Sequence, residues 1–180
     1  MASITFPLAI FVAITLTLTL KISSATAETN ERETRLHFYM QERDVAPNVT
    51  IIKVVSGSDD QSDGSLKFGD LCVFDNALTE GYYPTTRHIG RLHGTAVTST
   101  LDGSVGLFSV NLIFTDFHPW TGSSLTAIGG FYIQKGTGEL QAVGGTGEFR
   151  KAQGYVLLSR LPNEDINSSI FELEVVLLNN

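Results

Sequence analysis

Asp75 is the first residue in this sequence whose type and position could do chemistry. It follows a segment, 68–74, whose alternation predicts a strand with Leu71 and Val73 on one face. Asp75 falls on that same face, and an acid on a buried face must be paired, protonated or lining a cavity that uses it. The alternative is that Asp75 ends the strand and caps the following turn through its own backbone. Spacing alone favours the cap.

The remaining residue types with catalytic or metal-binding chemistry form no recognisable motif. Cys72 is the only cysteine, so an internal disulfide is excluded, and its apolar strand is typical of a buried, inert thiol. The four histidines show no HxH or HExxH spacing. The glycine-rich segment 144–147 lacks the Lys-Ser/Thr and the helix of a phosphate loop. We therefore expect no metal and no cofactor.

The N-terminal segment 1–27 predicts a secretory signal peptide. Residues 4–20 are apolar with interspersed threonines, and Ala25-Thr26-Ala27 has the small-x-small pattern of a cleavage site. A membrane anchor is the rival interpretation, but the run is slightly short and too rich in threonine. The mature chain would then be one domain, 28–180, in the extracellular space, with no membrane association after cleavage.

The net charge argues against two classes of partner, and two sequons predict glycosylation. The formal net charge is −7, and no basic run or arginine-rich stripe exists, so nucleic acid and anionic membranes are poor partners. Asn48 and Asn167 each begin an Asn-x-Ser/Thr sequon. In a secreted protein we expect both to be glycan sites.

Strand-like segments separated by turns follow one another along the mature chain, and none shows a sustained helical period. Roughly eight strands without a helix predict an all-β sandwich or barrel. Glycines within the long strands favour a barrel, whose interior would have room for one small ligand. The segments are 35–43, 49–55, 68–77, 89–100, 105–117, 125–134, 140–143, 149–160 and 170–178.

A set of ordered motifs across the mature chain resembles the plant dirigent proteins. The motifs are LHFYMQE (36–42), FGDLCVFDNALTEG (68–81), GRLHG (90–94), FTDFHPWTGSSL (114–125), AVGGTGEFRKAQGY (142–155) and FELEVVLL (171–178). The resemblance implies a secreted, glycosylated, eight-stranded antiparallel up-and-down β-barrel of the dirigent and allene oxide cyclase-like type, which self-associates as a dimer or trimer.

The resemblance also implies a function in plant secondary metabolism. Dirigent proteins impart stereoselectivity on phenoxy-radical coupling, as when two coniferyl alcohol radicals form an optically active lignan. They have no oxidative activity, so a separate laccase or peroxidase makes the radicals, and the protein is a stereo-directing auxiliary rather than a classical enzyme. Positioning the two radicals is enough to control the stereochemistry, because a free-energy difference of about 1.4 kcal/mol between the two faces gives tenfold selectivity. The alternatives are a quinone-methide cyclase or isomerase of the same fold and a non-catalytic phenolic-binding or cell-wall barrel.

Residues carried over from the resemblance complete the predicted site. Glu42 takes the family's first acidic place and Asp75 the second, which outweighs the capping alternative for Asp75. Ser123 and Gly130 stand near the places where lignan-forming members have an aspartate and many members an arginine, departures that bear on lignan specificity and not on the fold. Five residues are predicted to line the substrate pocket, with core packing as the alternative: Phe38, Met40, Leu71, Val73 and Phe114.

Apolar residues on both faces of the strand 68–77 predict a homo-oligomer. Cys72 and Phe74 lie opposite Leu71 and Val73, so one apolar face must point out of a small barrel. A second subunit is the simplest cover for that face.

Overall fold

The computed structural model describes residues 32–57 and 65–179, and the predicted signal peptide lies outside them. The described residues form strands joined by turns, with one short 3₁₀ helix, η1 (Gly147–Phe149), and no α-helix. The strands are β1 (Arg32–Arg43), β2 (Ile51–Val55), β3 (Leu71–Thr79), β4 (His88–Thr98), β5 (Val105–Phe114), β6 (Ser124–Tyr132), β7 (Thr137–Thr146), β8 (Gln153–Leu161) and β9 (Ser168–Asn179).

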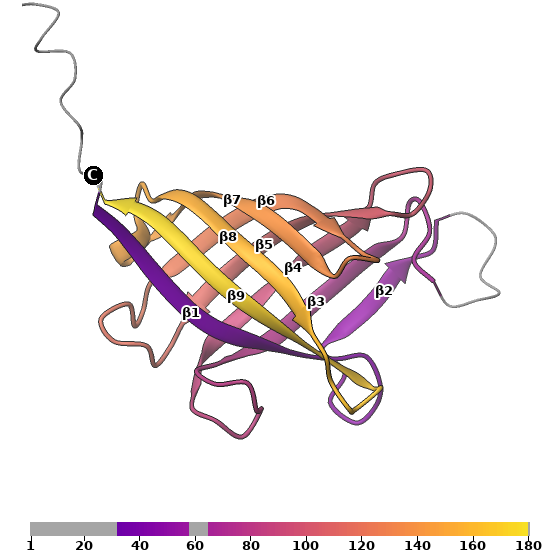
Figure 1. Cartoon of the computed structure of the whole chain (residues 1–180), viewed down its shortest axis with the longest axis horizontal. Helices are drawn as coiled ribbons and strands as arrows, with labels where there is room; N and C mark the ends of the chain where they lie inside the picture. The colour runs from indigo at the N-terminus through magenta and orange to yellow at the C-terminus, as the bar shows by residue number, and fades with distance from the viewer. Residues whose placement is uncertain (1–31, 58–64, 180) are drawn as a thin grey trace, which may run out of the picture. The chain divides into compact units, whose positions relative to one another are not determined.

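The strands close into an antiparallel barrel (Figure 1). The order around the sheet is β1-β9-β8-β7-β6-β5-β4-β3, and β3 pairs back with β1. Each strand from β3 to β9 lies beside the next one along the chain, which is up-and-down connectivity. The predicted eight-stranded antiparallel barrel is therefore confirmed.

Strand β2 is a ninth strand that shares one place in the ring with β1. β1 pairs with the second half of β3, at 77–79, whereas β2 pairs with its first half, at 71–74. The loop 44–50 separates them, and its ends are held together because Thr50 N donates to Arg43 O over 2.8 Å. The backbone N of Arg43 in turn donates to Thr50 Oγ1 over 2.8 Å. The loop thus leaves the barrel wall between β1 and β2 without opening the ring.

Alternation along each strand fills the barrel with apolar side chains. Phe38, Phe114, Leu125 and Leu173 are among the fully buried residues, and they come from four different strands. Glycine is required at position 94, because a Cβ there would overlap the backbone oxygen of Ser109 on the neighbouring strand.

Candidate functional site

A small cavity of about 90 Å³ lies inside the barrel, at the end where β1 finishes and β9 begins. Four of its 13 lining residues are phenylalanines, namely Phe74, Phe108, Phe131 and Phe171. Phe108 stacks on Phe131 with the ring centroids 5.1 Å apart, and Phe74 and Phe171 each lie 5.8 Å from one of these two rings. Such aromatic surfaces suit a flat phenolic ring.

Glu42 brings a carboxyl group to this cavity from the end of β1. It is half-buried, and Asn76 Nδ2 donates a hydrogen bond to its Oε2 over 3.2 Å. Burial raises the pKa of Glu42, although the hydrogen bond from Asn76 and the positive charge of Arg160 oppose that shift. Glu42 therefore keeps its proton to a higher pH than an ordinary glutamate and is suited to act as an acid.

Asn76 lies on the interior face of β3 and is fully buried. Its amide nitrogen contacts Met40 Sδ over 3.4 Å as well as Glu42, whereas its Oδ1 has no hydrogen-bond partner among the described residues. An unsatisfied buried carbonyl costs free energy. A proton donor next to it, such as protonated Glu42 facing a rotated amide or a ligand hydroxyl, would remove that cost.

Arg160 supplies positive charge to the same cavity. Its guanidinium carbon lies 5.4 Å from the ring centroid of Phe171 and 6.0 Å from that of Phe131. The side chain is exposed on its outer side, so it stands at the mouth of the cavity. Stacked on two rings, Arg160 can interact with an oxygen of a bound phenol while the rings hold the apolar part.

Cys72 also lines the cavity, as a buried thiol. Burial raises its pKa, an effect that the nearby Lys53 charge only partly opposes, so the thiol stays protonated. The predicted burial of Cys72 is confirmed, and a protonated, buried thiol is not the reactive form that a catalytic cysteine needs.

Asp75 and the neighbouring Leu71 and Val73 face outward, which corrects the sequence-based expectation for β3. The Asp75 side chain is 58% exposed and pairs with Arg91 at 2.7 Å, and Val73 is 40% exposed. The strand continues to Thr79, so Asp75 is not a turn cap either. Because side chains alternate, Cys72, Phe74 and Asn76 occupy the interior face, and Asn76 rather than Asp75 reaches Glu42.

Phe38, Met40 and Phe114, the other predicted pocket residues, are buried in the barrel but do not line this cavity. Phe38 meets Phe114 edge to face, with their ring centroids 5.6 Å apart. Met40 supports Asn76 through its sulfur. Core packing, the alternative left open by the sequence, therefore describes their surroundings.

Asn76 and Arg160 were missed by sequence reasoning, although the strand period holds a signal for both. Asn76 follows Cys72 and Phe74 at spacing two, and Arg160 follows Val156 and Leu158 in the same way. Each polar residue thus continues an apolar series into the interior, as Glu42 does on β1.

The two sequon asparagines lie in adjacent loops near the Glu42 end of the barrel. Asn48 is exposed and Asn167 is half-buried, and Asp44 N donates to Asn167 O over 3.4 Å. Glycosylation of both stays a prediction.

The described residues include no group of metal ligands and no helix of membrane-spanning length. Within 32–57 and 65–179, no three histidine, cysteine or acidic side chains are grouped as metal ligands. In the same ranges, no helix is long and apolar enough to cross a membrane.

Together, the described residues form a closed antiparallel barrel with an aromatic cavity and the Glu42 carboxyl group at its mouth. Comparison with known protein families identifies the family of this barrel. The family model for dirigent-like proteins matches residues 33–178, so the chain belongs to the dirigent family.

Individual relatives support that assignment. Dirigent protein 1 from Arabidopsis thaliana is 32% identical over 127 residues, which cover 71% of this chain and 69% of the relative. Pterocarpan synthase 1 from Glycyrrhiza echinata is 29% identical over 126 residues, covering 69% and 66% of the two chains. A solved structure of the pterocarpan synthase dirigent protein GePTS1 superposes with a TM-score of 0.74 at 24% identity, covering 85% of this chain and 88% of that one, and shows the shared fold.

Proposed function

We propose that this protein directs bond formation in one phenolic molecule through a quinone methide, with Glu42 as the proton donor. The observation that carries the proposal is a half-buried carboxyl of raised pKa beside a cavity lined by phenylalanines. General acid catalysis works best when the acid is still protonated near the working pH, and burial moves Glu42 in that direction.

The chemistry begins on a phenolic benzylic alcohol that carries a second hydroxyl group. Glu42 donates its proton to the benzylic hydroxyl, the C–O bond breaks and water leaves, while the phenol releases its own proton to solvent to give a neutral quinone methide. The second hydroxyl then forms a C–O bond to the methide carbon and returns its proton to Glu42. The phenol oxygen regains a proton from solvent, so the net reaction is ring closure with loss of one water.

The carboxyl group of Glu42, rather than the size of the cavity, favours this reaction over radical coupling, since about 90 Å³ is small for either substrate. Radical coupling needs no proton donor, so it leaves the raised pKa of Glu42 without a role. Two relatives called pterocarpan synthase support the proposal, since a pterocarpan is a closed-ring phenolic.

Stereoselective radical coupling is the second candidate. The phenylalanine lining favours it, because stacking can fix the face of a phenoxy radical without any proton transfer. In that function the protein would work with a separate laccase or peroxidase and contribute no oxidation of its own. A barrel that only binds a phenolic would alter neither rate nor stereochemistry.

One experiment separates the three functions. The protein is incubated with a phenolic benzylic alcohol of this type without oxidant, and in parallel with coniferyl alcohol and a one-electron oxidant, and the products are resolved by chiral chromatography. Ring closure without oxidant supports the quinone-methide function. Enantiomeric excess only in the oxidant arm supports radical coupling, and saturable binding with no effect in either arm supports a carrier.

We also propose an extracellular location. The signal-like segment 1–27 and the two sequons support it. Expression of the full chain in plant cells, followed by N-terminal sequencing of protein from the medium, should give Glu28 as the first residue; retention inside the cells would contradict the proposal.

A further inference from the structure

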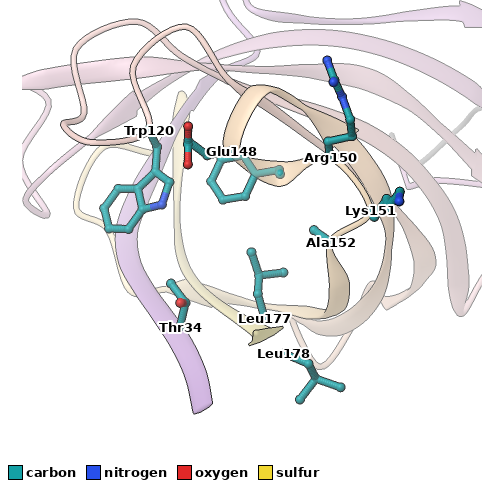
Figure 2. Close-up of a pocket in the computed structure, with 9 residues that line it drawn as sticks. Thr34, Trp120, Glu148, Arg150, Lys151, Ala152, Leu177 and Leu178 are labelled. Carbon is teal, nitrogen blue, oxygen red and sulfur yellow. The ribbon is translucent and has the colours of Figure 1, made fainter. Parts of the chain in front are cut away.

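A second hollow, of about 390 Å³, lies at the opposite end of the barrel from Glu42 (Figure 2). Thr34, near the start of β1, and Leu177, near the end of β9, form part of it. The segment 148–152, between β7 and β8, and Trp120, between β5 and β6, complete its walls. The chemistry proposed for Glu42 uses none of these residues.

The turn that forms one wall of this hollow is anchored by hydrogen bonds and by a close backbone approach at Gly147. Glu148 N donates to the buried Ser123 Oγ over 3.1 Å, and Ala152 N donates to Phe149 O over 3.0 Å. Gly147 has φ +58°, and a Cβ there would lie 2.4 Å from Ser123 Oγ, so only glycine fits. The side chains that follow are therefore presented from a fixed backbone, which lowers the entropic cost of binding.

Charged groups of both signs surround the hollow. Figure 2 shows the Glu148 carboxylate on the side of Trp120, whereas Arg150 and Lys151 lie across the hollow from Trp120. None of these three charged side chains has a hydrogen bond or ion pair within the part of the chain that the structure describes. The hollow thus offers acceptors on one side and donors on the other.

This arrangement selects the charge of a ligand. An anion would be repelled by Glu148, and a cation would be repelled by Arg150 and Lys151. A neutral ligand with several hydroxyl groups satisfies both sides, because each hydroxyl donates and accepts. Trp120 is half-buried and adds a flat apolar face and an N–H donor, against which the C–H face of a ring can pack.

We propose that this hollow binds a neutral sugar ring, with Trp120 as the platform, Glu148 as the hydroxyl acceptor, and Arg150 and Lys151 as donors. Its volume falls within the range of pockets that hold small molecules, about 300–1,000 Å³. A sugar could arrive free or as part of a longer chain, and the hollow recognises the ring in either case.

Fluorescence tests the proposal directly, since Trp120 is the only tryptophan in the chain. The protein is titrated with glucose, cellobiose, mannobiose and xylobiose, and with glucuronate and glucosamine as charged comparisons. We expect a saturable change in tryptophan emission with at least one neutral sugar and weaker responses to both charged ones. A disaccharide that binds more tightly than glucose would indicate a chain as the natural ligand.

Variants identify the site. Glu148→Gln and Lys151→Gln should each weaken the response about tenfold, because a hydrogen bond to a charged group is lost. Glu164→Gln changes an exposed acid elsewhere and should leave the fluorescence response to sugar unchanged. Thermal melts test whether all three variants fold. No response to any neutral sugar, stronger binding of a charged sugar, or an unaltered response in Glu148→Gln would overturn the proposal.

Discussion

Asn76 donates a hydrogen bond of 3.2 Å to Glu42, and this contact joins β3 to β1 inside the barrel. The donor is fully buried and its amide oxygen has no partner among the described residues. The pair therefore suits two protonation states of Glu42, one accepting from the amide nitrogen and one donating to the amide oxygen after rotation of the amide.

Stability should depend on pH through Glu42. Its folded-state pKa is raised by burial, so the native protein holds this proton more tightly than the unfolded chain. As pH rises above the ordinary value of 4.5, the native state loses stability until the folded pKa is passed. Glu42→Gln removes that loss. Urea unfolding of both proteins at pH 4 and pH 8 measures it, and a stability difference that does not change with pH would contradict the raised pKa.

A second carboxyl beside Glu42 should shift the pH dependence further. Asn76→Asp places two acids within hydrogen-bond distance, and like charges so close cannot both ionise at low cost. We expect activity to persist to higher pH, because Glu42 would keep its proton longer. We also expect the folded state to be less stable at neutral pH. Asn76→Ser, which adds no charge, is the control. A pH–rate profile identical in all three proteins would show that position 76 does not influence Glu42.

Two aspartates in different surroundings should differ sharply in their effect on stability. Asp70 is fully buried and accepts from Lys53 Nζ, Gly57 N and Lys67 N at 2.6, 2.8 and 2.9 Å. Burial opposes ionisation of Asp70, but these hydrogen bonds and the Lys53 charge together hold its pKa below the ordinary value. Asp70→Asn replaces a buried, charged acceptor of three hydrogen bonds with a neutral amide and should cost about 3 kcal/mol or more of unfolding free energy.

Asp75→Asn is the matched comparison. Its ion pair with Arg91 is exposed on both sides, so the loss should stay below about 1 kcal/mol. The stabilising effect of Asp70 is present above its unfolded pKa and disappears as pH falls through the lower folded value. Chemical denaturation at neutral pH measures both variants, and equal losses would contradict the assignment of Asp70 to the interior and Asp75 to the surface.

We propose that a second copy of the chain covers the outer face of β2 to β5. Ile52 lies opposite Val73, and Val97 lies opposite Leu107, with exposed fractions of 55, 40, 37 and 45%. Leu107→Lys should shift the protein towards the monomer, because the charge would be buried on association. Sedimentation at micromolar concentration measures this, with Leu101→Lys in an exposed turn as the control. A wild-type protein that sediments only as a monomer would contradict the proposal.

The barrel was predictable because its strands carry a simple repeating signal. Alternating apolar residues, glycines within long strands and turn residues between them are local features, and they indicate strand number and class. The resemblance to dirigent proteins then predicted closure of the barrel and its up-and-down connectivity, which the strand order confirms.

The interior site was only partly predictable, because it depends on which face of each strand turns inward. β3 is apolar on both faces near its start, so the sequence does not show whether Leu71 and Val73 or Cys72 and Phe74 point inward. The pairing of β1 with β3 determines which face points inward and brings Glu42 to Asn76. That contact joins residues that lie 34 positions apart in the chain, and no local pattern reports it.

The most direct test of proton donation by Glu42 is the rate of ring closure without oxidant in wild type, Glu42→Gln and Asp75→Asn. A general acid contributes roughly a hundredfold or more, so Glu42→Gln should lose at least that factor. Asp75→Asn, on the outer face, should match wild type. Equal rates for Glu42→Gln and wild type would contradict the proposed function, as would a loss in Asp75→Asn as large as that in Glu42→Gln.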